Sequence, residues 1–155
     1  ENAGWSLYAV VGVDAVATRL IDVGAPGARL YLARGWSRDE TMGDVTFSWI
    51  EGQQALLLAR WDGAGAATLT LRAAPFSYPG SARQDMTLVV NGRRAGTLAM
   101  KDGWQEYAVS LPSGMLTDGI NRIELQFAHA VSPAQALGSD DRRTLAAAVD
   151  WMRLD

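Results

Sequence analysis

Trp36 stands in a short polar segment whose residue types suit recognition of a sugar. A glycine precedes it and Ser37-Arg38-Asp39-Glu40 follows, so hydrogen-bond donors and acceptors surround one large aromatic ring. The face of such a ring packs on the apolar C–H face of a pyranose, while planar guanidinium and carboxylate groups bind the hydroxyls. We therefore expect a loop here, with Trp36 as the stacking surface and Arg38 and Glu40 as hydrogen-bonding groups.

Trp104 is the second candidate for a stacking surface. It precedes a segment of alternating polarity in which Glu106 and Ser110 share its face, while Tyr107 and Val109 lie opposite. Because successive side chains of a strand point to opposite faces, the Trp104 ring is predicted to face outward. The sequence therefore predicts that Trp104 contributes to ligand binding.

Structural interpretations compete with these assignments. Both Trp36 and Trp104 could close the edge of the core, because large aromatic residues are usually mostly buried. Glu40 could form an ion pair with an arginine of the segment 141–143 and so hold two loops together. The sequence favours this ion pair over a ligand contact for Glu40.

The composition excludes several other chemistries. With no Cys, the chain has no disulfide, thiolate metal site or cysteine nucleophile. Its single histidine, His129, has no Ser-His-Asp arrangement around it. The net charge of −3 gives no broad positive field for nucleic acid or an anionic membrane. No apolar run approaches the roughly 20 residues of a membrane-spanning helix.

Catalysis of glycoside cleavage would need two carboxylates facing each other across a cleft. Glu51, Asp62, Asp85 and Glu106 are candidates, but each lies beside a predicted turn or on a wet strand face. Nothing in the sequence pairs any two of them. We expect no catalytic residues and a domain that is not an enzyme.

Strands must position these residues, because a period of two dominates the sequence. Polar and apolar residues alternate over four segments, 45–49, 68–72, 105–111 and 120–127. Each is predicted to be a strand with one buried and one wetter face, whereas the apolar run 55–59 predicts a more fully buried strand. In the first of them, Trp49 alternates with Val45 and Phe47 and is predicted to lie in the core. Trp5, Trp61 and Trp151 are left open between core and rim.

Turn residues separate the predicted strands. Asn91-Gly92 predicts a tight hairpin with a type I′ turn between 86–90 and 93–100. Ser132-Pro133 predicts the start of a short helix over 133–137.

Residues 142–154 fit either a helix or a strand, and we favour a final strand. About ten short strands predict one all-β domain over residues 1–155, an antiparallel two-sheet jelly-roll β-sandwich. Because the chain begins at Glu1 without Met or a signal peptide, we expect it to be either a processed chain or a segment of a larger protein.

Several motifs resemble known families. Residues 86–92 form a strand followed by Asn-Gly, and residues 104–125 combine a tryptophan, a strand and a Gly-x-Asn-x-Ile-x-Leu-like stretch near 119–125. This order is similar to galactose-binding-like jelly rolls, many of which are carbohydrate-binding modules. Over 20–155, the motifs at 21–24, 35–40, 47–49 and 140–145 also resemble the soluble β-domain attached to bacterial membrane glycosyltransferases.

This resemblance implies a possible metal site. Asp22 and Asp150 lie in the first and last strands, which are neighbours in this topology, and related modules hold a structural Ca²⁺ near such a junction. The paired N-terminal acidic residues usual for that site are missing here. The sequence therefore predicts no required cofactor, with calcium at Asp22 and Asp150 as the alternative.

The resemblance also sets the functional expectation. It implies a non-catalytic, carbohydrate-binding accessory domain of an extracytoplasmic or membrane-anchored bacterial protein, associated with a glycosyltransferase and located in the periplasm or at the cell surface. Its partner would be a carbohydrate or the parent carbohydrate-active protein, without nucleic acid or direct membrane insertion. The alternatives are a structural protein-interaction domain that binds no sugar and, third, a β-sandwich glycoside hydrolase or lyase.

Overall fold

The computed structural model describes residues 20–63 and 65–155, and strands make up most of these residues. One 3₁₀ helix, η1 (Pro26–Leu30), and one short helix, α1 (Pro133–Leu137), accompany them. The strands are β1 (Leu20–Asp22), β2 (Leu32–Arg34), β3 (Trp36–Met42), β4 (Val45–Glu51), β5 (Gln54–Trp61), β6 (Ala67–Pro75), β7 (Asp85–Val90), β8 (Arg93–Ala99), β9 (Gln105–Leu111), β10 (Gly119–Phe127) and β11 (Leu145–Leu154).

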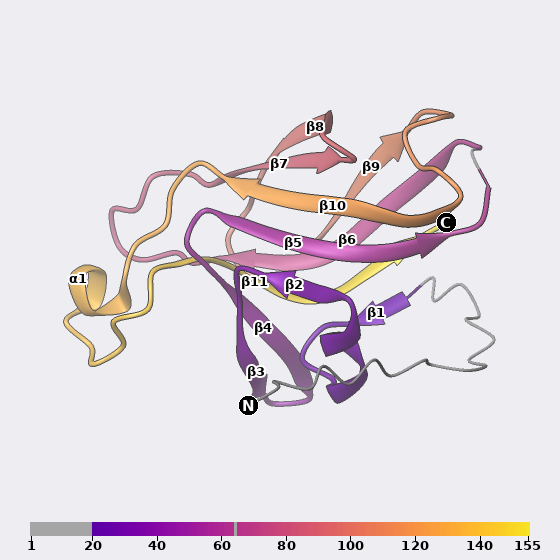
Figure 1. The fold of residues 1–155 in the computed structure, drawn as a ribbon. Helices are drawn as coiled ribbons and strands as arrows, with labels where there is room; N and C mark the ends of the chain where they lie inside the picture. Colours follow the sequence, from indigo (N-terminus) through magenta and orange to yellow (C-terminus); the bar gives the residue numbers. More distant parts are fainter. Residues whose placement is uncertain (1–19, 64) are drawn as a thin grey trace, which may run out of the picture.

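The strands form two antiparallel sheets that pack face to face (Figure 1). The six-stranded sheet has the order β3-β4-β11-β6-β9, with β1 paired to β11, and the five-stranded sheet has the order β2-β5-β10-β7-β8. The last strand therefore lies in the middle of its sheet, between strands from early in the chain. This arrangement confirms the predicted all-β jelly-roll sandwich, and the final segment is a strand rather than a helix.

Alternating side chains of the two sheets fill the space between them. The inward residues of β6 and β10 are among the most deeply buried: Leu69, Leu71, Ile123 and Leu125 are 1% exposed or less. Phe127 is 5% exposed and belongs to the same cluster. The faces predicted for 68–72, 105–111 and 120–127 are therefore confirmed.

The turn and the helix start predicted from local sequence are both confirmed. Asn91 and Gly92 join β7 to β8 with φ angles of 50° and 78°, which are the positive values that a type I′ turn requires. At α1, the Ser132 side chain accepts a hydrogen bond from the Gln135 backbone N–H at 3.2 Å, and Pro133 follows the cap as predicted.

The prediction for the faces of β4 is wrong. Ile50 is fully buried in the core, and Ser48, predicted to lie on the wetter face, is also fully buried. The Ser48 hydroxyl is satisfied because it donates a hydrogen bond to the Ser37 carbonyl at 2.8 Å. Phe47 and Trp49 consequently project from the opposite, outer face of the six-stranded sheet.

Candidate functional site

The outer face of the six-stranded sheet carries the side chains that alternate with the core residues. Arg72 of β6 lies between inward Leu71 and Ala73, and Ala74 follows Ala73, so Arg72 and Ala74 point outward. Ala148 of β11 is paired with both Trp49 and Ala74, so small residues form the centre of this face. Large rings from neighbouring strands can pack over these alanines.

Five aromatic residues gather on this face and its adjoining loop, and we call them the outer aromatic cluster: Phe47, Trp49, Phe76, Tyr78 and Trp104. Successive ring centroids lie between 5.6 and 6.0 Å apart. Three of the four contacts are edge-to-face, an arrangement that aromatic pairs prefer. The structure thus confirms that Trp104 lies on the outer side of its sheet.

An ion pair lies beside this cluster. The Arg72 guanidinium donates a hydrogen bond to the Asp150 carboxylate and also lies over the Trp104 ring, 5.4 Å from its centroid. Asp150 is only 8% exposed. A carboxylate this buried needs a cationic partner, and Arg72 supplies one with planar donors.

A pocket of about 400 Å³ opens next to this ion pair. It is lined by residues of β1, the β3–β4 turn, β4, β6 and β11: Leu20, Asp22, Asp44, Val45, Thr46, Arg72, Asp150, Trp151 and Arg153. The Arg153 guanidinium lies 5.8 Å from the centroid of the Trp151 ring and is ion-paired with Asp155 at 2.6 Å. The pocket therefore combines one aromatic ring with several planar hydrogen-bonding groups, the combination that sugar recognition needs.

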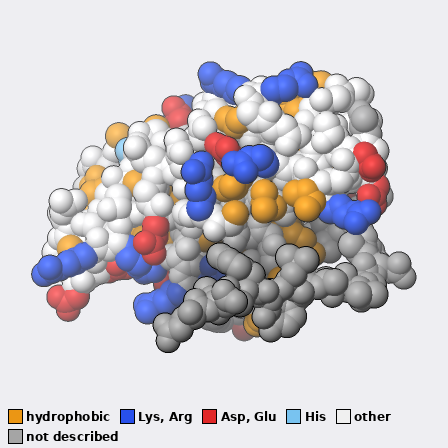
Figure 2. All heavy atoms as spheres, viewed as in Figure 1, with side chains coloured by type: hydrophobic (Ala, Val, Ile, Leu, Met, Phe, Trp, Pro, Cys, Tyr) orange, Lys and Arg blue, Asp and Glu red, His pale blue; other side chains and the backbone are white. Residues whose placement is uncertain are grey.

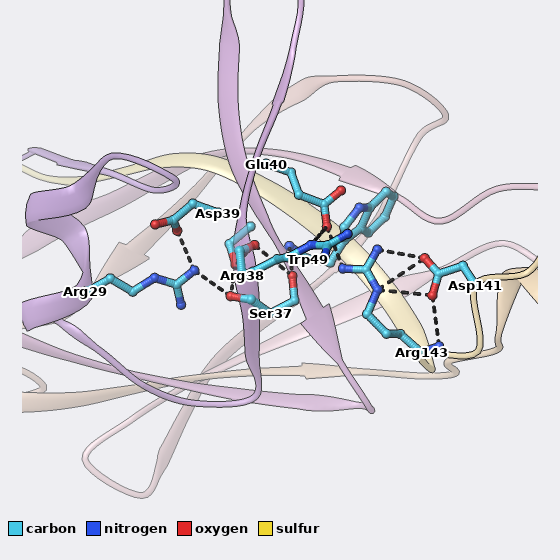
Figure 3. A network of polar contacts seen from close by, with 9 residues as sticks. Arg29, Ser37, Arg38, Asp39, Glu40, Trp49, Asp141 and Arg143 are labelled. Carbon is cyan, nitrogen blue, oxygen red and sulfur yellow. Dashed lines mark hydrogen bonds and ion pairs between the residues drawn. The ribbon is translucent and has the colours of Figure 1, made fainter.

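A second polar network joins β3 to the segment before β11 (Figure 3). Arg143 donates to Glu40 Oε1 at 2.5 Å and to Asp141 Oδ2 at 2.7 Å. The hydrogen bond to Asp141, followed by that to Glu40, raises the pKa of Arg143, whereas the Arg143 side chain lowers the pKa of Asp141. The predicted ion pair between Glu40 and this segment is confirmed.

Arg38 lies at the margin of this network. Its guanidinium is 3.8 Å from Glu40, and its side chain is 81% exposed. Arg38 also lines an open pocket of about 470 Å³ with Glu51 and residues 140–143. Arg38 and Glu40 are thus brought together, but Glu40 is already engaged by Arg143.

Trp36 does not lie in a loop, so that prediction is wrong. It is the first residue of β3, packs against the core, and donates its indole N–H to the Leu56 carbonyl at 2.9 Å. Gly35 before it has φ +80°, and a Cβ there would lie 2.0 Å from the Gln54 carbonyl oxygen. The glycine thus permits a close strand crossing, and the geometry of Trp36 agrees with the alternative in which it closes the sandwich.

The predicted neighbours Asp22 and Asp150 do meet at the β1–β11 junction, where Asp22 pairs with Trp151, and both line the 400 Å³ pocket. Asp150 is ion-paired with Arg72, and Asp22 accepts a hydrogen bond from the Thr46 hydroxyl at 3.2 Å. No group of three His, Asp or Glu side chains suited to a metal occurs within residues 20–63 and 65–155. Calcium at Asp22 and Asp150 therefore stays a prediction, and the contacts of these carboxylates with Arg72 and Thr46 argue against it.

The four carboxylates considered for catalysis come from different parts of the fold, with Asp62 directly after β5 and the other three in β4, β7 and β9. Asp62 is ion-paired with Arg60 at 3.3 Å, and Asp85 lies 3.8 Å from Arg83. Glu51 ends β4, and Glu106 lies on the outer face of β9.

Sequence reasoning missed Arg72 and left Trp151 undecided. Arg72 alternates with buried Leu71 and Ala73, so its outward position follows from the pattern, but its proximity to Trp104 and Asp150 depends on which strands pair. Trp61 packs against the core, and Trp5 lies outside the described residues. Within the described residues, no helix is both long and apolar enough to span a membrane.

Comparison with known proteins finds no matching family model and no match among curated proteins. Solved structures share the fold. CBM35 from Cellvibrio japonicus Abf62 gives a TM-score of 0.53 at 19% identity, over 88% of this chain and 91% of that one. The module CBM6cm-2 from Cellvibrio mixtus lichenase 5A, in complex with cellotriose, gives a TM-score of 0.50 at 14% identity, over 90% of this chain and 98% of that one.

A third similar structure is a much larger chain. It is an exo-β-1,3-galactanase from Phanerochaete chrysosporium with β-1,3-galactotriose, matched with a TM-score of 0.50 at 17% identity over 80% of this chain and 27% of that one. The chain thus has the jelly-roll fold of carbohydrate-binding modules, as its motifs predict.

Proposed function

We propose that this chain is a non-catalytic carbohydrate-binding domain. Its binding site is the 400 Å³ pocket together with the outer aromatic cluster. One observation carries the proposal: Trp151, Arg72 and Asp150 line the same pocket. The similar solved structures support it, because two of them are carbohydrate-binding modules and one holds cellotriose.

Binding follows from the chemistry of the pocket. The Trp151 ring offers apolar surface for the C–H face of a sugar ring. Arg72 and Asp150 are held in place by their own ion pair, so their remaining donors and acceptors are fixed before a ligand arrives. A pre-ordered site loses less side-chain entropy on binding than a mobile one.

The parent protein is part of the same proposal. We propose that the domain is an accessory part of a larger extracytoplasmic or membrane-anchored bacterial protein that acts on carbohydrates, such as a glycosyltransferase. The motifs at 21–24, 35–40, 47–49 and 140–145 support this proposal through their resemblance to the soluble domains of such enzymes. The galactanase supports the accessory role, because the matched region is 27% of that chain.

A glycan array with the 155-residue chain tests the proposal, followed by calorimetric titration of the best ligand. Trp151→Ala should weaken binding about tenfold, which corresponds to roughly 1.4 kcal/mol for the lost aromatic surface. Ile120→Ala is the matched control, because Ile120 is an exposed apolar residue, 70% accessible, in the other sheet. No glycan bound, or equal loss in both variants, would refute the proposal.

A second candidate function is protein interaction through the outer face of the five-stranded sheet. Hydrophobic side chains gather on this face beside positively charged side chains (Figure 2). Ile120 is 70% exposed there, and Leu58 lies on the neighbouring strand β5. Sedimentation velocity should then show an oligomer that the Ile120→Ser variant does not form. A monomer at all protein concentrations would rule out self-association by this face.

A further inference from the structure

The charges lining the 400 Å³ pocket are unevenly paired. Two arginines and three aspartates line it, and both arginines already have carboxylate partners. Arg72 is ion-paired with Asp150, and Arg153 is ion-paired with Asp155 outside the lining. The positive charges of the pocket are thus neutralised.

The other two aspartates have no cationic partner among the described residues. Asp22 accepts a hydrogen bond from the Thr46 hydroxyl at 3.2 Å, and Asp44 lies in the turn between β3 and β4. Both residues are solvent-exposed. The pocket therefore presents two uncompensated negative charges next to the Trp151 ring.

We infer that this pocket prefers a sugar that carries a protonated amino group. The inference rests on the proposed function, because Trp151, Arg72 and Asp150 must bind the sugar ring in the first place. An ammonium group on the ring gains attraction from Asp22 and Asp44, whereas an acetamido group gains none. A uronate carboxylate at the same position is repelled.

The expected preference is moderate because both carboxylates are exposed and screened. Exposed ion pairs contribute weakly, so an amino sugar should bind about three- to tenfold more tightly than its N-acetylated counterpart. Raising the salt concentration should reduce this ratio, since screening weakens exposed charge pairs.

The test compares three trisaccharides, of glucosamine, N-acetylglucosamine and galacturonic acid, on an array that also carries neutral glucans and xylans. Calorimetric titration of the first two at low and high salt measures the ratio. The double variant Asp22→Asn with Asp44→Asn should bind the amino and N-acetylated sugars equally and retain its thermal midpoint. Asp118→Asn is the matched control, because it removes one charge from a turn that does not line the pocket.

The outcomes separate this inference from the proposed function. The inference is supported if the glucosamine trisaccharide binds most tightly. Its preference over the N-acetylglucosamine trisaccharide must also fall at high salt and in the double variant. Binding confined to neutral or acidic glycans, or a ratio of one, overturns the preference while carbohydrate binding stands. An array without any bound glycan overturns the proposed function itself.

Discussion

Replacing Trp36 by alanine should destabilise the fold and leave ligand binding at the pocket unchanged. The ring packs against the core from the first position of β3, and its indole N–H donates to the Leu56 carbonyl at 2.9 Å. Losing a partly buried tryptophan should cost about 3 kcal/mol of unfolding free energy. Roughly 1 kcal/mol of that loss should come from the hydrogen bond.

Trp36→Phe separates the two contributions. It keeps most of the packed ring but removes the indole donor, so it should cost only about 1 kcal/mol. Urea denaturation followed by tryptophan fluorescence measures both variants, and titration with the best glycan measures binding under native conditions. If Trp36→Ala kept its urea midpoint and lost affinity, the ring would be a ligand contact and the placement of the site would be wrong.

Three further changes test other parts of the structure. Phe127→Ala should lower the unfolding free energy by about 3–5 kcal/mol through a core cavity, measured by urea denaturation, and an unchanged midpoint would contradict its burial. Gly35→Ala should lower the free energy of unfolding several-fold more than Gly43→Ala. Both glycines have positive φ, but only at position 35 would the new Cβ lie against a strand carbonyl; equal thermal midpoints of the two variants would refute this. Because Arg143 lowers the pKa of Asp141 in the folded state, their interaction stabilises the protein above the ordinary Asp pKa of 3.8 and is lost as pH falls through the lowered value. Asp141→Asn should therefore lower the thermal midpoint at neutral pH, with a difference that shrinks in acid, and a constant difference would contradict the assignment.

Much of the fold could be predicted because its signals are local. The type I′ turn depends on Asn91 and Gly92 themselves, and the cap of α1 depends on Ser132 and its immediate neighbours. Alternation over 120–127 also suffices to place Leu125 and Phe127 inward, because their polar neighbours cannot be buried without partners.

The site was harder to predict because it depends on partners distant in sequence. Alternation in β4 separates two faces, but both are largely covered, one by the core and one by the outer aromatic cluster. Ser48 could take the inward position only because Ser37, eleven residues away, supplies an acceptor. Arg72 and Asp150, 78 residues apart, become neighbours only when β6 pairs with β11. The polar run after Trp36 indicated a loop, but pairing with β4 makes it a strand.

Nuclear magnetic resonance of the tryptophan indole N–H groups tests the central claim most directly. Each tryptophan gives one such signal, which can be assigned by single Trp→Phe variants, and titration with the best glycan shows which signals move. The proposed site predicts saturable shifts at Trp151 and Trp104, with Trp36 and Trp61 unaffected because both pack against the core. Shifts at Trp36 with none at Trp151 would place the ligand elsewhere and contradict the assignment of the pocket as the carbohydrate site.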